Sequence, residues 1–343
     1  MNALRERVRA LKFVPIDPAG SYIPMTFKSF DGGKFDLRFE PFEFEVVKVA
    51  DSNGNIKMNF AAPVGDFEDG DIGYVLEGLD ANPTMRQFLD ILRIRSLREI
   101  SRFLTAKGTL MEIAEFACMF EAITRAPGDD TYMILKDGLL RTRKIRDDLI
   151  PHMIDYIHRN ADRVSVAGVA KTSKILFLLQ AALACERVFP PDQMGYVKIP
   201  LDLENMAYKW SPTTRIRPEM PTRLAYAFGD LYIAKLSPET NLLVTVELPQ
   251  GYDGACIYSD SRIVEIMSYL AKDSMYSYPV MGYPQTIMRA HESAAGIGFP
   301  ASILYEKIVE GLVDRSDPAL AGYIRDSTML DEAVSKEQLG GMV

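Results

Sequence analysis

The stretch TYMILKDGLLRT, residues 131–142, is the part of the chain from which the fold is best inferred. Its apolar run, Met133 to Leu135, is typical of a central strand that is buried on both faces. Asp137 and Gly138 end this run. An Asp-Gly pair is a common turn sequence, but a carboxylate at the tip of a buried strand, next to a glycine, can also reach into a cleft. Both interpretations of Asp137 stay open on this stretch alone.

The segments around this strand predict a mixed α/β fold built on one sheet. Residues 27–60 alternate apolar and polar side chains around the turn sequence Asn53-Gly54-Asn55, which predicts strands joined by hairpins. Further strands are expected at residues 163–171, 206–210, 223–236 and 241–249. Helices are expected at residues 1–12, 82–104 (capped by Asn82 or Thr84), 109–126, 145–161, 173–189, 261–274, 284–297 and 300–313. Residues 40–105 could form an insertion or lobe on the sheet.

Composition excludes several classes of protein. The net charge is -8, so the chain as a whole has no basic signature for nucleic acid, and a nucleic-acid role would need a local basic channel. The cysteines number three and are scattered, which favours a reducing compartment over a disulfide framework. The longest apolar stretch, residues 175–185, is too short to span a bilayer and is interpreted as a buried helix. We therefore expect a cytoplasmic protein that has no membrane segment and no signal peptide.

Acidic residues occur in two strand-end contexts and on one helix. Asp31, in FKSFDGGKFDL, follows an extended segment and precedes two glycines, as Asp137 precedes one. The helix upstream of Asp137 carries Glu112, Glu115 and Glu121. Two such aspartates on neighbouring strands, with a glutamate from a packed helix, would form an all-oxygen site that suits Mg²⁺ or Mn²⁺ and not Zn²⁺. The alternative is that the aspartates are turn residues and the glutamates are solvated.

The histidines and one lysine add fewer constraints. His152 and His158 lie six positions apart on one helix, hence on different faces, and predict no metal pair. His291 follows Tyr283-Pro284 by one to two helical turns, and its imidazole could bind a metal, carry a proton or be structural. Lys171 ends a strand and could meet a phosphate or be solvated.

Five stretches, in this order, resemble the motifs of the NurA nuclease family, which has an RNase H-like core and partners the HerA translocase in DNA end processing. They are FKSFDGG (27–33), LMEIAEFA (110–117), MILKDGLLRT (133–142), SVAGVAKTSK (165–174) and GYPQTIMRAHESA (282–294). They are similar to the family's first Asp-Gly motif, its glutamate helix, its second Asp-Gly motif, its glycine-valine-lysine strand end and its Tyr-Pro and Ala-His signature. The resemblance runs from about residue 25 to about residue 315.

The resemblance implies roles for individual residues. Asp31, Glu115 and Asp137 would bind metal ions, with His291 as a further ligand or proton carrier. Tyr283 and Lys171 would contact the DNA phosphate or assist the chemistry. Glu121 competes with Glu115, which is preferred because the end of its helix, a turn and a strand fit between it and Asp137. Two hydroxyls are missing, since Gly33 and Leu139 stand where the family usually has serine.

The resemblance also implies a fold and an activity. The fold would be an RNase H-like mixed sheet flanked by helices, with an additional β-rich and helical insertion. One nuclease domain would cover residues 1–343, with a core at about 25–315, a helix at 1–12 and a polar tail at 318–343. The chain would be a homodimer that hydrolyses DNA with two Mn²⁺ or Mg²⁺ ions, docked on a HerA-like hexameric ATPase, in DNA end processing, repair or defence against phage. The alternatives are an inactive binding or assembly subunit of this fold, and an RNase H-like enzyme that acts on RNA or on RNA–DNA hybrids.

Overall fold

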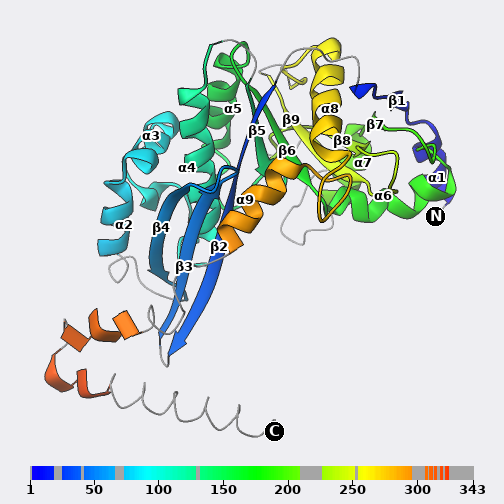
Figure 1. Ribbon diagram of the computed structural model, residues 1–343. Coiled ribbons are helices and arrows are strands. Elements are labelled where there is room, and N and C mark those ends of the chain that lie inside the picture. Colours follow the sequence, from blue (N-terminus) through cyan, green and yellow to red (C-terminus); the bar gives the residue numbers. More distant parts are fainter. Residues whose placement is uncertain are drawn as a thin grey trace, which may run out of the picture.

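The computed structural model describes residues 2–18, 25–39, 42–65, 73–128, 132–208, 226–251 and 254–295, with short stretches between 306 and 323 (Figure 1). Its strands are β1 (Val14–Pro15), β2 (Thr26–Phe39), β3 (Phe42–Asp51), β4 (Ile56–Pro63), β5 (Tyr132–Asp137), β6 (Ser165–Ala170), β7 (Gly195–Lys198), β8 (Gly229–Lys235) and β9 (Val244–Pro249). Its helices are α1 (Asn2–Arg9), α2 (Gly73–Asp80), α3 (Pro83–Leu92), the 3₁₀ helix η2 (Leu97–Glu99), α4 (Thr109–Arg125), α5 (Ile150–Arg159), α6 (Lys174–Cys185), α7 (Leu201–Tyr208), α8 (Asp260–Ser274) and α9 (Gln285–Ala295).

The strands form one mixed sheet of nine, in the order β1-β7-β8-β9-β6-β5-β2-β3-β4. β2, β3 and β4 form an antiparallel meander, and β5 and β6 continue from β2 as parallel neighbours. The remaining pairs are antiparallel. This mixed sheet flanked by helices is the α/β architecture that the motif resemblance implied. Residues 40–105 contribute β3 and β4 to the same sheet before they continue into α2 and α3.

Helices cover both faces of the sheet. On one face, α2 to α5 pack against β2 to β5 around one apolar core, and α1, α6 and α7 pack around another beside β7 and β8. On the other face, α8 packs on β6, β8 and β9, and α9 packs along β2 and β3. Figure 1 shows α9 lying across the front of β2. The sheet therefore has α4 behind β2 and α9 in front of it.

β5 and β6 are buried because the sheet is covered on both sides at its centre. Every residue of β6 is buried, and Met133 to Leu135 of β5 are fully buried. Gly168 allows a close crossing, since a Cβ there would lie 2.7 Å from the backbone nitrogen of Leu140. The loop after Asp137 can thus pass directly over β6. Gly138 has φ +88, a conformation that favours glycine.

Two expectations about elements are wrong. The helix expected at 82–104 ends at Leu92, where Arg93 adopts a left-handed conformation with φ 60, although its beginning is capped by Asn82 as predicted. Residues 206–208, expected in a strand, belong to α7, and residues 209–210 lie outside the described part. α2 and β7 were not expected. Of the helix expected at 300–313, residues 306–307, 309–311 and 313 are described and are helical.

α6 is not the buried helix that its composition suggested. Five of its residues are buried, but Phe177 is 89% exposed.

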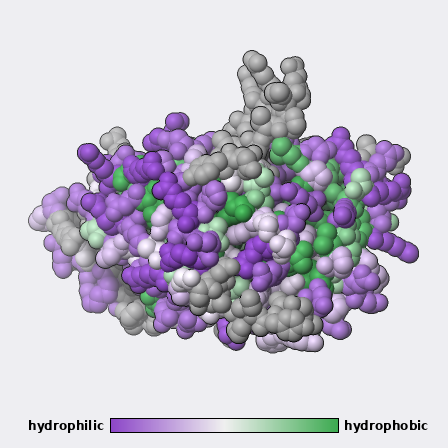
Figure 2. Space-filling view, turned by 90° about the horizontal axis from the view of Figure 1, so that it is seen from above, coloured by the Kyte–Doolittle hydropathy of each residue, from purple (hydrophilic) through white to green (hydrophobic). Residues whose placement is uncertain are grey.

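Seen from above, hydrophilic side chains dominate the surface, and apolar ones gather toward the half of the molecule that holds α8 and α6 (Figure 2). None of the helices in the described residues is long and apolar enough to cross a membrane.

Candidate active site

The register of the central strands brings Asp31 and Asp137 to the same place in the sheet. β2 and β5 run parallel and pair up to Phe30 opposite Lys136, so the aspartates are the next residue on each strand. Side chains alternate along a strand, and Phe30 faces the core beneath α4. The next residues therefore face α9. Two strand ends far apart in sequence thus present carboxylates side by side, as the sequence predicted for these two residues.

α9 adds His291 to the aspartates. The Nδ1 atom of His291 lies 2.7 Å from Oδ2 of Asp31, which is a hydrogen-bond distance between residues 260 positions apart. The helix comes this close because Gly33 has no side chain: a Cβ there would overlap the carbonyl oxygen of Ala294. A side chain at position 33 would therefore collide with the backbone of α9.

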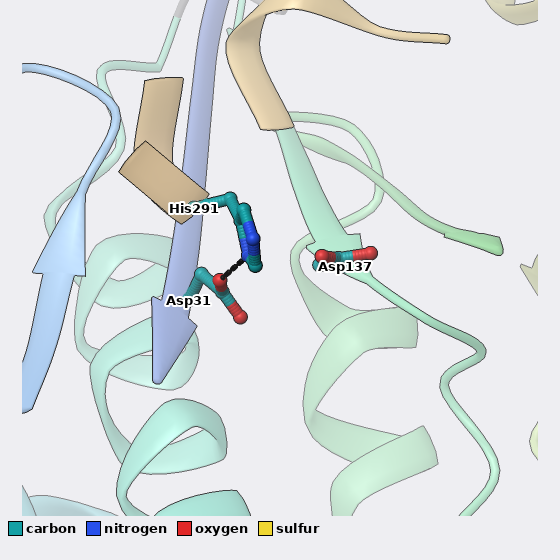
Figure 3. A group of neighbouring side chains, drawn as sticks. All are labelled: Asp31, Asp137 and His291. Carbon is teal, nitrogen blue, oxygen red and sulfur yellow. Dashed lines mark hydrogen bonds and ion pairs between the residues drawn. The ribbon is translucent and has the colours of Figure 1, made fainter. Parts of the chain in front are cut away.

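Asp31, Asp137 and His291 form a group with the geometry of a cation site. One ligand atom from each residue can be chosen so that all three lie within 4.8 Å of one another. Figure 3 shows the side chains reaching toward a common space from β2, β5 and α9. Two carboxylates and an imidazole are donors that Mn²⁺ accepts, and Mg²⁺ favours the carboxylates. The donor set therefore fits the divalent ions that the resemblance implied.

Tyr283 orients Asp137 from the loop before α9. Its fully buried hydroxyl donates to Oδ1 of Asp137 at 2.6 Å and lies 2.9 Å from the carbonyl oxygen of Val169. Burial, and then the charge of Asp137, raises the pKa of Tyr283 well above its ordinary value, so the phenol stays a donor. Lys171 is exposed, and its Nζ atom lies 5.7 Å from the centre of the Tyr283 ring. Tyr283 thus contacts Asp137 directly, and Lys171 lies beside the Tyr283 ring.

Glu115 lies at the same strand ends but on the opposite face. Its Oε1 accepts the backbone N–H of Gly32 at 3.0 Å, at the point where β2 leaves β5. Its Oε2 lies 3.5 Å from Nζ of Lys136. Both oxygens are therefore engaged, and Glu115 is not one of the three residues that share the cation-site geometry. Glu121 is further along α4 and contacts Thr84, Lys57 and Arg125.

Lys136 is a buried cation that the sequence analysis did not consider. Its side chain is 9% exposed and lies over the ring of Phe116 at 5.2 Å, and Nζ donates to the carbonyl oxygen of Asp137 at 3.0 Å. A lysine inside the apolar run MILKD is a signal that could have identified it, since buried lysines nearly always have an acidic partner. Lys136 neutralises Glu115 from the α4 side of the sheet.

Two acids near these strand ends, Asp31 and Glu115, have pKa values above those of ordinary carboxyls. Burial, followed by the charge of Asp137, raises the pKa of Asp31, while the hydrogen bond with His291 opposes this. Burial raises the pKa of Glu115 to about 7, against the effect of Lys136, which lowers it. Burial disfavours the charged form of a carboxyl, and a nearby positive charge favours it. The cluster is therefore arranged to gain from a bound cation.

Comparisons with known proteins give distant matches. No family model matches the chain, and no curated protein matches it. The NurA nuclease from Sulfolobus solfataricus is 14% identical, with a TM-score of 0.46 over 92% of this chain and 93% of that chain. A NurA structure with manganese is 10% identical, with a TM-score of 0.47 over 91% and 96%. A NurA structure bound to dAMP and manganese is 9% identical, with a TM-score of 0.44 over 94% and 94%. Each of these three matches extends over about nine-tenths of this chain.

Proposed function

We propose that this chain is a nuclease that hydrolyses phosphodiester bonds of DNA with the help of Mn²⁺ or Mg²⁺. One observation carries the proposal: Asp31, Asp137 and His291, from three distant segments, converge within 4.8 Å. The order of the five NurA-like motifs supports the same activity. The likeness to the solved NurA structures does not support an activity, because these structures are 14% identical to this chain or less.

Each residue has a role that follows from its position. Asp31 and Asp137 would hold the cation, and Tyr283 fixes the orientation of Asp137 through its hydroxyl. The side chain of His291 is 49% exposed, so it can bind the ion or exchange a proton with solvent. Glu115 would join the ligands by leaving Lys136. A pair of ions, when bound, polarises the phosphodiester and lowers the pKa of the attacking water. Lys171 supplies a positive charge for the phosphate.

The test is the variant Asp137→Asn. It keeps the size of the side chain and the hydrogen bond from Tyr283 but removes the charge, so we expect the Mn²⁺-dependent degradation of linear DNA to be lost while the fold is kept. Exposed Asp162, changed to asparagine, is the matched control and should degrade DNA at the wild-type rate. Circular dichroism and thermal unfolding would show that both variants are folded. Degradation by Asp137→Asn at the wild-type rate would contradict the proposal. Single strands, duplexes and RNA–DNA hybrids, assayed side by side, would define the substrate.

The motif resemblance supports a proposal about assembly as well. The chain would form a homodimer and dock on a HerA-like hexameric ATPase, which would grip and feed the DNA in end processing, repair or defence against phage. The net charge of -8 suits a nuclease that leaves most of the DNA binding to a partner. Sedimentation of the chain alone and with such an ATPase would test both interactions.

A further inference from the structure

A groove with basic and aromatic lining lies between two loops, one after η2 and one between β5 and α5. It has a volume of about 390 Å³ and is formed by residues 101–103 of the loop after η2 and residues 143–148 of the loop between β5 and α5. Four of its lining residues are basic and two are acidic. They are Arg102, Arg143, Lys144 and Arg146, with Asp147 and Asp148. This excess of positive charge is the reverse of the charge of the whole chain.

The aromatic member is Phe103, which is 65% exposed although it is a large apolar side chain. Its position is fixed, since its backbone N–H donates to Oγ of Ser101 at 3.1 Å and its carbonyl accepts from Ala106 at 3.1 Å. A phenylalanine held open to solvent beside cations has the chemistry of a platform on which an unpaired base can stack.

The two loops are held together, so the groove is built into the fold. The backbone N–H of Arg146 donates to the carbonyl oxygen of Ile100 at 2.9 Å, and its guanidinium donates to that of Glu99 at 3.2 Å. The guanidinium of Arg143 lies over the ring of Tyr226 at 4.6 Å, which fixes its plane. Backbone and ring contacts thus preset the positions of the positive charges.

Contacts of Lys144 connect the groove with α4, the helix that carries Glu115. Nζ of Lys144 donates to the carbonyl oxygen of Gly108 at 2.5 Å and lies 3.4 Å from Oε2 of Glu112. Glu112 is one turn before Glu115 on α4. The groove therefore lies on the α4 side of the sheet, and its first residue after β5, Arg143, follows Asp137 by six positions.

We propose that this groove binds a single-stranded part of the nucleic acid substrate, with a base stacked on Phe103 and phosphates near Arg102 and Arg143. The inference rests on the proposed function, since it takes the substrate to be a polynucleotide. A duplex fits less well, because its bases present no free face to an aromatic side chain. The groove would help the enzyme to hold frayed or unwound ends.

Binding without cleavage tests the groove. In EDTA, the wild-type chain should bind oligothymidylate about tenfold tighter than an abasic strand of equal length, because only the former can stack on Phe103. Phe103→Ala should bind both strands equally. Arg102→Ala should weaken the binding of both strands. It should also reduce the slope of log K against log salt concentration by about 0.7, the value for one phosphate contact of a single strand. Fluorescence anisotropy measures all of these affinities.

Matched controls and two separate failures make the result decisive. Phe177→Ala removes a more exposed phenylalanine, and Arg159→Ala removes an exposed arginine of α5, so both should bind like the wild type. If Phe103→Ala and Arg102→Ala also bind both strands like the wild type, the groove proposal is overturned, even if the wild-type chain degrades DNA. If they bind as expected but Asp137→Asn degrades DNA normally, the nuclease proposal fails and the groove stands.

Discussion

Gly32 and Gly33 allow two helices to approach Asp31 from opposite faces of β2. A Cβ at Gly32 would lie 2.6 Å from Oε1 of Glu115 and 2.6 Å from Cγ of Met111, both on α4. A Cβ at Gly33 would overlap the backbone of α9 at Ala294. The two glycines therefore determine how closely Glu115 and His291 can lie to Asp31.

Gly33→Ala is predicted to separate His291 from Asp31. The added methyl group meets backbone, which cannot rotate away, so we expect a loss of about 1–3 kcal/mol in the free energy of unfolding and a weaker affinity for Mn²⁺. Gly128→Ala is the control, because a Cβ there meets nothing within 4 Å. Chemical denaturation and Mn²⁺ calorimetry would measure both effects. Equal stability and affinity in the two variants would refute the steric role of Gly33.

At this scale the sequence predicted which residues would gather, but not how they touch. Asp31, Asp137 and His291 lie within 4.8 Å of one another, Tyr283 donates to Asp137, and Lys171 lies beside the Tyr283 ring. The hydrogen bond from Tyr283 to Asp137 and the engagement of Glu115 by Lys136 depend on side-chain directions across the sheet. Spacing along the chain contains no information about these directions, whether the two residues are 21 positions apart, as Glu115 and Lys136 are, or 146, as Asp137 and Tyr283 are.

The junction of α8 and α9 places His291, and the partly buried carboxylate of Asp273 holds it together. Both oxygens of Asp273 on α8 accept from Thr286 at the beginning of α9, one from its backbone N–H at 3.1 Å and one from its hydroxyl at 3.0 Å. Burial raises the pKa of Asp273 from 3.8 to about 6 despite these bonds. The junction is therefore sensitive to pH.

Asp273→Asn is predicted to reduce the pH dependence of stability. Because the pKa of Asp273 is raised on folding, the folded chain holds its proton more tightly than the unfolded chain, so this contribution is complete below about pH 3.8 and is lost as the pH rises to about 6. The wild-type free energy of unfolding should fall by up to about 3 kcal/mol more than that of the variant across this window. Urea denaturation at several pH values measures the free energy of unfolding of the wild type and of the variant. Parallel curves for the two proteins would contradict the prediction.

Helices and strands formed where the sequence pattern predicted them when the local sequence and the tertiary packing favoured the same structure. Asn82 caps α3 through bonds to Thr84 and Met85, as its position before a proline suggests. The apolar spacing beyond Leu92 extended the predicted helix too far, because Leu97, Ile100 and Leu104 are buried without being α-helical. In the same way, α7 has Asp202 and Glu204 in its first turn, a helix signal that outweighed the strand-like residues after it.

At the scale of the whole molecule, the order of the strands in the sheet creates the site. Its nine-strand order joins β5 to β2, so residues 106 positions apart lie side by side, and α9 then closes the site from another part of the chain. A mixed α/β fold could be predicted from the alternation of elements. The pairing of β6 with β9 and of β7 with β8 could not, because such contacts are chosen by packing between distant segments.

The most direct test is the anomalous diffraction of crystals that contain Mn²⁺. We predict an anomalous peak bonded to carboxylate oxygens of Asp31 and Asp137 and to a ring nitrogen of His291, and no such peak in crystals of Asp137→Asn. Wild-type crystals with saturating Mn²⁺ in which these three residues bind no ion would contradict the claim that they converge to hold a catalytic cation.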